Sequence, residues 1–181
     1  AKAEVLFKQI LSICENVLGV THTETAGVLN NLGLLAVRRR KYAEAESFYR
    51  RAIAIDEQQQ HPNGAQTLNN LALLYVKLRK YAEAEPLYQR ALAINEHDEN
   101  REEMVQVLIN FAQLYVEQRR LEEARQLYER ASVMCARGGI QPTTIQGLQE
   151  NYRWFRRVQK RYLWVDRISG RKRGGSVRGR T

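Results

Sequence analysis

The stretch Thr67–Ile94, TLNNLALLYVKLRKYAEAEPLYQRALAI, decides the fold of this 181-residue chain. Two further copies flank it, VLNNLGLLAVRRRKYAEAESFYRRAIAI at Val28–Ile55 and VLINFAQLYVEQRRLEEARQLYERASVM at Val107–Met134. Matched leucines recur 39 and 40 residues apart, at Leu29, Leu68 and Leu108. A fixed period near 40, with helical texture inside each unit, predicts an all-α fold, an α-solenoid of stacked helix-turn-helix repeats.

Each unit contains two amphipathic helices joined by a short turn. In the middle unit, apolar residues recur at three- and four-residue steps from Leu68 to Leu78 and again from Ala84 to Leu92. The loops between units are short and polar, so consecutive pairs must stack as neighbours. We therefore expect three helical pairs over residues 24–136.

The flanking segments complete this organisation. Residues 1–18 match the second helix of a unit without its first, which predicts an N-terminal half-repeat. Residues 142–168 predict a capping helix, because they are amphipathic but lack the repeat pattern. Residues 169–181 contain four glycines and almost no apolar side chain, so we expect this tail to be disordered. The pattern begins inside a helix at Ala1, which fits a processed organellar protein or a piece of a longer array.

The charge of the chain is concentrated at its C-terminal end. The net charge is +9, yet residues 151–181 hold eleven Lys and Arg against Asp166, which leaves residues 1–150 nearly neutral. Flexible Arg/Gly segments follow polyanion backbones, so the tail is a candidate site for RNA. An acidic protein, a lipid surface and a merely solvated terminus remain open. The candidate polyanion-binding residues are Arg171, Lys172, Arg173, Arg178 and Arg180.

Composition excludes several classes of protein. No run approaches the roughly 18–20 apolar residues of a membrane helix. Cys14 and Cys135 lie at opposite ends of the array, so we expect free thiols and an intracellular, reducing compartment, either the cytoplasm or an organellar matrix. His22, His61 and His97 each lie between pairs without a second ligand at metal spacing. We therefore predict no metal, no cofactor and no catalytic residue, and expect the YAEAE glutamates to face solvent.

The repeat resembles a known family. Leu71-Ala72-x-x-Tyr75, followed by Tyr81-x-x-Ala84-x-x-x-Tyr88-x-x-Ala91, is similar to the tetratricopeptide repeat, and its roughly 40-residue form resembles the kinesin-light-chain-like subset. The resemblance covers about residues 3–136. It implies a right-handed α-solenoid that acts as a non-catalytic scaffold for protein binding.

One departure from the family recurs in every unit. Members usually carry Gly in the turn between the two helices, where this chain has Arg40, Arg79 and Arg119. A non-glycine residue in a left-handed conformation costs on the order of 1 kcal/mol. Together with neighbouring cations these residues predict a basic edge, which is either a docking surface for an acidic protein or nucleic acid, or simply solvated. Its residues are Arg39, Arg40, Lys41, Arg79, Lys80, Arg119 and Arg120.

The resemblance also implies a concave groove lined by the first helices. Its asparagines would hydrogen-bond the backbone of an extended peptide, beside an apolar floor with mixed charge at one side. The alternatives are that the asparagines bond across adjacent helices, or that the tail fills the groove. The predicted groove residues are Asn30, Asn31, Leu34, Val37, Arg38, Asn69, Asn70, Leu73, Val76, Lys77, Asn110 and Gln113.

Two functions follow from these features. The first is a protein–protein interaction scaffold that holds a partner peptide or acidic protein surface, and whose basic extension anchors it in a larger assembly. The alternative is an accessory protein of a ribonucleoprotein whose Arg/Gly-rich tail contacts RNA. Neither requires a small-molecule substrate or a membrane span.

Overall fold

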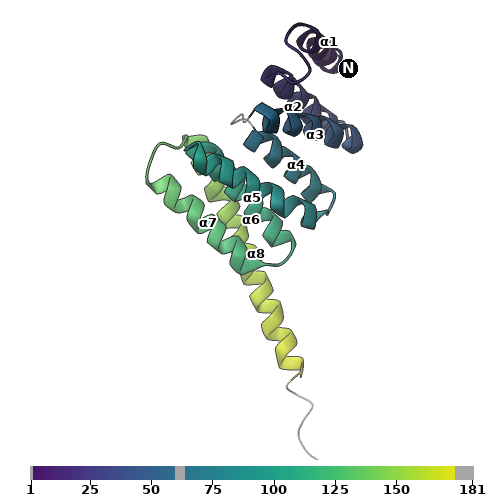
Figure 1. Cartoon of the computed structure of the whole chain (residues 1–181). Helices are drawn as coiled ribbons and strands as arrows, with labels where there is room; N and C mark the ends of the chain where they lie inside the picture. The colour runs from purple at the N-terminus through teal and green to yellow at the C-terminus, as the bar shows by residue number, and fades with distance from the viewer. Residues whose placement is uncertain (1, 60–63, 174–181) are drawn as a thin grey trace, which may run out of the picture.

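A computed structural model describes residues 2–59 and 64–173, and every regular element in these ranges is an α-helix (Figure 1). The all-α solenoid predicted from the sequence is confirmed. The helices are α1 (Lys2–Val17), α2 (Thr23–Arg38), α3 (Tyr42–Gln59), α4 (Gly64–Lys77), α5 (Tyr81–His97), α6 (Arg101–Glu117), α7 (Leu121–Ala136) and α8 (Pro142–Arg173).

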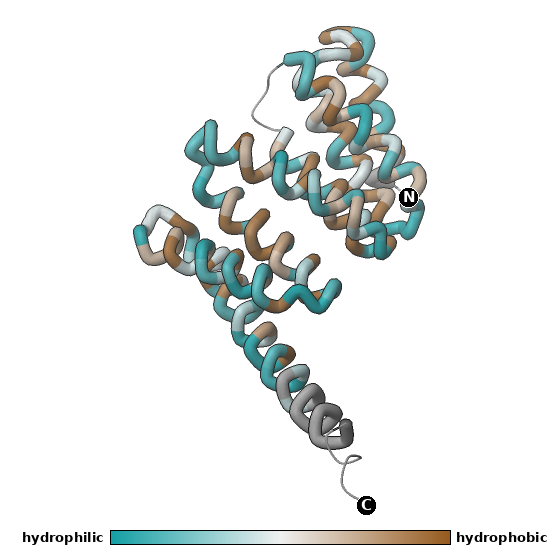
Figure 2. The backbone as a smooth tube through the Cα atoms, turned by 60° about the horizontal axis from the view of Figure 1, so that its bottom comes forward, coloured by the Kyte–Doolittle hydropathy of each residue, from teal (hydrophilic) through white to brown (hydrophobic). Residues whose placement is uncertain are grey.

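The helices form three pairs, α2–α3, α4–α5 and α6–α7, and each pair packs on the next (Figure 1). Helix α1 packs on α2, and α8 packs on both α6 and α7. Figure 2 shows the apolar positions gathered on the sides along which the helices meet. The buried apolar side chains form two clusters, a smaller one where α1, α2 and α3 meet and a larger one that continues from α2 to α8. Such packing is expected of repeats that contact only their neighbours.

A tyrosine at the centre of each second helix fills the space beneath its own first helix. Tyr49, Tyr88 and Tyr128 are almost completely buried. In the first pair the ring of Tyr49 lies so close to Gly33 that a Cβ atom at Gly33 would come within 2.4 Å of it. Tyr88 stacks on Phe111 of the next pair, with ring centroids 5.3 Å apart. The tyrosine thus contributes both to the closure of its pair and to the stacking of pairs.

The turn within each pair has the same geometry three times. Arg40, Arg79 and Arg119 adopt φ values of 60°, 59° and 60°. The N–H of the following residue donates to a carbonyl five residues back, at 2.9 Å for Lys41 to Ala36 and 2.8 Å for Lys80 to Tyr75. This is the Schellman termination, which normally favours glycine at the left-handed position. These arginines therefore adopt the left-handed conformation that favours the glycine usual in the family at this position.

Helix α5 ends in the same way, although its sequence gives no family signal for it. Glu99 has a φ of 54°, and the N–H of Asn100 donates to the carbonyl of Asn95 at 3.0 Å. Asn100 then caps α6, because its side-chain oxygen accepts from the N–H of Glu103. A fourth left-handed non-glycine residue therefore sets the angle between the second and third pairs.

Helix α8 occupies the position of a first helix that follows α7. Leu148 and Phe155, which lie 40 residues after Leu108 and Tyr115, are 3% and 1% exposed. Thr144 donates a hydrogen bond to Glu102 of α6, which fixes the start of α8. The predicted capping helix therefore packs as the first helix of a further repeat would.

The end of α8 differs from the prediction. The helix continues to Arg173, whereas residues 169–173 were expected to be disordered. Between Leu148 and Arg173 there is no proline and only one glycine, Gly170, and the Arg, Lys and Gln residues favour helix, so adding turns to an existing helix costs little. Residues 174–181 of the predicted tail lie outside the described residues.

We predict that Gly33→Ala destabilises the protein by about 1–3 kcal/mol, because the new Cβ atom overlaps the buried Tyr49 ring. The matched control is Gly27→Ala on the same helix, where nothing lies within 4 Å, and which should stabilise by up to about 1 kcal/mol. Urea denaturation measures both. Equal effects of the two substitutions would contradict the packing of Tyr49 against Gly33.

We further predict that Arg40→Gly and Arg79→Gly each raise the free energy of unfolding by up to about 1 kcal/mol, since glycine relieves the left-handed conformation. Arg38→Gly removes the same charge from a helical position and should lower it by about 1 kcal/mol. Thermal unfolding of the three variants gives the comparison. A loss of stability in all three would show that the arginine side chains outweigh the backbone strain.

Candidate functional site

The first helices of the first two pairs expose apolar side chains at equivalent positions. Leu34 of α2 is 39% exposed and Leu73 of α4 is 36% exposed, and they lie 39 residues apart. Val37 and Val76 beside them are half-buried, and the exposed cations Arg38 and Lys77 follow at the helix ends. We call this surface the first-helix face. Its members are the residues predicted for the groove.

The asparagines of this face form a hydrogen-bonded ladder across adjacent helices. The Asn70 Nδ2 atom donates to Asn30 Oδ1 at 2.9 Å, and Asn110 Nδ2 donates to Asn69 Oδ1 at 3.0 Å. Asn30, Asn69 and Asn110 are buried, as polar groups inside a protein can be when they are paired. The structure therefore shows these asparagines bonding across adjacent helices, both for Asn70 with Asn30 and for Asn110 with Asn69. Asn31 is exposed, and no side chain in the described ranges contacts its amide by a hydrogen bond.

The first-helix face does not continue as an exposed apolar surface onto the third pair. Gln113 of α6 donates to Asn151 of α8, and Val116, the equivalent of Val37 and Val76, is only 5% exposed. Helix α8 is the element that covers these positions, because it packs on α6. Of the predicted groove residues on α6, Gln113 thus contacts α8 and Asn110 is buried with Asn69. On α2 and α4 the exposed groove residues are Asn31, Leu34, Arg38, Leu73 and Lys77.

Two glutamates of the YAEAE motif are not on the solvent face, which corrects the expectation from sequence. Tyr75 donates to Glu46 at 2.7 Å, and Tyr115 donates to Glu85 at 2.8 Å, each across a boundary between pairs. The hydrogen bond from Tyr75 lowers the pKa of Glu46. Burial, with the hydrogen bond to Glu85, raises the pKa of Tyr115 to about 12. These contacts tie neighbouring pairs together.

The same pattern changes at the last boundary. The residue equivalent to Glu46 and Glu85 is Arg125, and the residue equivalent to Tyr75 and Tyr115 is Phe155. A phenylalanine has no hydroxyl to satisfy, so the loss of the carboxylate leaves no buried donor unpaired. Phe155 instead packs on Tyr128, with ring centroids 5.3 Å apart.

The second helices carry a ladder of ion pairs on the opposite side of the array. Arg51 binds Glu15 at 2.7 Å, Arg90 binds Glu57, and Arg130 binds Glu96. The three arginines precede the small residues Ala52, Ala91 and Ala131, and each carboxylate belongs to the preceding unit. The pair of α1 with α3 therefore has the same form as the later ones, as expected if α1 is a second helix.

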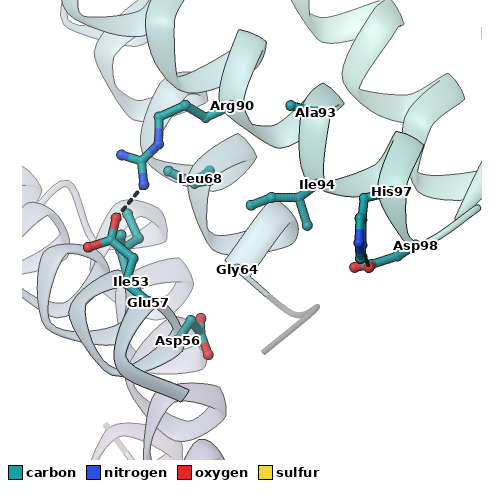
Figure 3. Close-up of a pocket in the computed structure, with 10 residues that line it drawn as sticks. All are labelled: Ile53, Asp56, Glu57, Gly64, Leu68, Arg90, Ala93, Ile94, His97 and Asp98. Carbon is teal, nitrogen blue, oxygen red and sulfur yellow. Dashed lines mark hydrogen bonds and ion pairs between the residues drawn. The ribbon is translucent and has the colours of Figure 1, made fainter. Parts of the chain in front are cut away.

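Two hollows accompany this ion-pair ladder. One, of about 450 Å³, has an apolar floor that includes Ile53, Leu68 and Ile94, with the Arg90–Glu57 pair on one side and His97 and Asp98 on the other (Figure 3). A second, of about 510 Å³, lies one repeat further along, beside the Arg130–Glu96 pair. Sequence reasoning missed both, although the repeated Arg-Ala step and its glutamate partner were visible signals.

Only some residues of the predicted basic edge lie exposed at equivalent positions. Arg40, Arg79 and Arg119 are exposed in equivalent turns, and Arg119 lies over the ring of Tyr162 of α8, 5.1 Å from its centroid. Other members bind within the array. Arg120 pairs with Glu85 and Glu123, Lys41 pairs with Glu44, and Lys80 lies over Tyr75. Arg39 is half-buried.

The remaining candidate residues are the cations of the tail, the histidines and the cysteines. Arg171, Lys172 and Arg173 form the last backbone turn of α8, and Arg178 and Arg180 lie outside the described residues. His22 caps α2, because its Nδ1 atom accepts from the N–H of Glu24, and His61 also lies outside the described residues. Both cysteines are free thiols. Among the described residues, no cluster of three His, Cys, Asp or Glu could hold a metal, and no helix is long and apolar enough to cross a membrane.

Stacked helical pairs with a ladder of contacts between neighbours define an α-solenoid repeat protein. A family profile described as Tetratricopeptide repeat matches residues 1–58 and 61–134. The chain belongs to the tetratricopeptide repeat family, as its motifs predicted, and the family is one of protein–protein interaction scaffolds.

Solved structures share the fold at low sequence identity. BtubC (BKLC) from P. vanneervenii is 24% identical with a TM-score of 0.68, over 78% of this chain and 59% of that one, so the chain spans well under two thirds of it. A Podosopora anserina kinesin light chain structure with nearly identical TPR-like repeats is 19% identical with a TM-score of 0.67, over 90% and 87%. The N-terminal domain of stress-induced protein-1 from C. elegans is 20% identical with a TM-score of 0.56, over 72% and 96%. A comparison with curated proteins gave no match.

We predict that Asn110→Ala destabilises the protein by about 1–3 kcal/mol, because it leaves the buried Asn69 carbonyl oxygen without its donor. Asn31→Ala, at the equivalent position of the first pair, should change stability by less than about 0.5 kcal/mol, since its side chain is exposed. Chemical denaturation distinguishes the two. Similar effects at both positions would mean that the ladder contributes nothing specific.

Proposed function

We propose that this chain is a scaffold that binds an extended segment of a partner protein on the part of the first-helix face formed by α2 and α4. The observation that carries the proposal is the exposure of Leu34 and Leu73 at equivalent positions of neighbouring pairs. Two leucines left accessible one repeat apart offer spaced apolar contacts. Such spacing suits an extended chain better than a compact small molecule.

The surrounding polar groups support the same ligand. The exposed amide of Asn31 carries both donors and an acceptor, which is what the main chain of an extended peptide requires. Arg38 and Lys77 place positive charge beside the leucines. Lys77 also lies over Tyr42, with its Nζ atom 5.9 Å from the ring centroid, so its position is fixed in part. We therefore expect the bound segment to combine apolar side chains with acidic ones.

The hydrogen-bonded asparagines then have a supporting role. The amides of Asn70 and Asn110 are used within the array, so they hold α2, α4 and α6 in register. A face preorganised in this way loses less conformational entropy on binding. The basic C-terminal part of the chain would hold the scaffold within a larger assembly.

The test is selection of phage-displayed peptides on the whole chain, followed by calorimetry of the synthetic peptides. The double substitution Leu34→Ser and Leu73→Ser should weaken binding about tenfold or more, which corresponds to about 1.4 kcal/mol. Stability should change little, because both side chains are exposed. Val133→Ser, at an exposed position of α7 on the other side of the array, is the matched control and should bind as the parent does. Peptides that bind the double variant as tightly as the parent would refute the proposed face.

A further inference from the structure

The outward side of α8 carries cations that nothing else in the described structure neutralises. Arg153, Arg157, Lys160 and Trp164 follow one another at i, i+4, i+7 and i+11, so they form one line along the helix. We call these four residues the α8 stripe. They span about 16 Å at 1.5 Å per residue. A hollow of about 510 Å³ beside the stripe is lined by Arg153, Arg156, Arg157 and Lys160, together with Gln149 and Tyr152.

These cations differ from the arginines on the second helices of the array. Arg51, Arg90 and Arg130 each meet a glutamate of the preceding unit. Among the side chains that the structure describes, by contrast, none forms an ion pair or hydrogen bond with the stripe cations or with Arg156 and Arg161. Glu150 is the only described acidic side chain on α8, and its contact is with Gln146. The positive field of this helix is therefore available to an external polyanion.

The aromatic side chains on the same helix narrow the choice of polyanion. Trp154 is 45% exposed and Trp164 is 63% exposed, although large aromatic side chains are usually covered. An indole among arginines can stack on a nucleobase while the guanidinium groups contact phosphates. Neither an acidic protein surface nor a simple counter-ion requires exposed indole rings.

A membrane surface fits less well. Helices that adsorb to a bilayer present a broad apolar face to it. The apolar side of α8 is already used, because Leu148 and Phe155 are buried against α6 and α7. Figure 1 shows α8 running past the α6–α7 turn, so that its later turns project beyond the other helices.

We propose that the α8 stripe binds single-stranded nucleic acid, with Arg153, Arg157 and Lys160 contacting phosphates and Trp164 stacking on a base. Trp154 lies beside the stripe and provides a second stacking position. This site is separate from the first-helix face, so it does not depend on the peptide-binding proposal. It also differs from the Arg/Gly tail of residues 169–181, because its residues lie between Arg153 and Trp164.

Binding is measured by the fluorescence anisotropy of a dye-labelled oligo(U) RNA of about 20 nucleotides, titrated with the full chain between about 50 and 200 mM salt. The triple substitution Arg153→Gln, Arg157→Gln and Lys160→Gln should weaken binding about tenfold or more. It should also reduce the slope of log K against log salt by about 2, at 0.7 for each lost phosphate contact. The tail keeps all its arginines in this variant.

The matched control removes the same charge elsewhere, by Arg40→Gln and Arg79→Gln on the basic edge together with Arg38→Gln on the first-helix face. It should change RNA affinity by less than about threefold, because these residues lie on the first two pairs. Equal weakening by both triple variants would show non-specific attraction, and unchanged binding of the stripe variant would assign the RNA to the tail. Either result would overturn the proposal.

Stacking has its own readout, because the two tryptophans of the chain are Trp154 and Trp164, both on α8. Unlabelled oligo(U) should quench tryptophan fluorescence, whereas polyphosphate of equal charge should bind without comparable quenching. Quenching of the same size by both polymers would contradict base stacking. Binding to vesicles of phosphatidylserine and phosphatidylcholine in preference to oligo(U) would replace the nucleic acid by a membrane.

Discussion

The whole array depends on the tight turn inside each pair, in which an arginine is held in the left-handed conformation. Two backbone hydrogen bonds close this turn, and their geometry fixes the angle at which the second helix returns along the first. That angle places Tyr49 against Gly33, and it places the equivalent tyrosines where they reach the next pair. The backbone strain at Arg40, Arg79 and Arg119 is therefore maintained by the packing that it makes possible.

The contacts between pairs form three independent ladders. Asparagines join the first helices, a tyrosine–glutamate hydrogen bond joins each first helix to the preceding second helix, and arginine–glutamate pairs join successive second helices. All three repeat with the period of the sequence. At the last boundary two of the ladders change, since Arg125 replaces the glutamate and Phe155 the tyrosine of one ladder, and Ala136 stands where the next carboxylate of the arginine–glutamate ladder would be. The contact between α7 and α8 therefore lacks the tyrosine–glutamate hydrogen bond that joins the earlier units.

The period and the apolar pattern were sufficient to predict the helices and the three pairs, because these depend on residues close in sequence. The contacts between pairs were harder to predict. Whether Asn70 faces a ligand or Asn30 depends on the rotation of one pair against the next, which a single pair does not determine. The glutamates of YAEAE were placed on the solvent side for the same reason. A signal in the sequence could have revealed the tyrosine–glutamate contacts. A glutamate and a tyrosine occur together as Glu46 with Tyr75 and as Glu85 with Tyr115, and both are replaced together, by Arg125 and Phe155.

The distribution of charge also separates structure from binding. Within the array the arginines on the second helices meet carboxylates, so their charge is used in stacking the units and the body stays nearly neutral. In the described residues no further helix covers the outward side of α8, so this side must be hydrophilic. A mixture of acidic and basic side chains would be enough for solubility. Helix α7 has such a mixture, because Arg125 pairs with both Glu122 and Glu129. The α8 stripe, with three cations and Trp164, and the exposed Trp154 beside it go beyond that requirement. This excess distinguishes α8 from a helix whose only role is to cover α6 and α7.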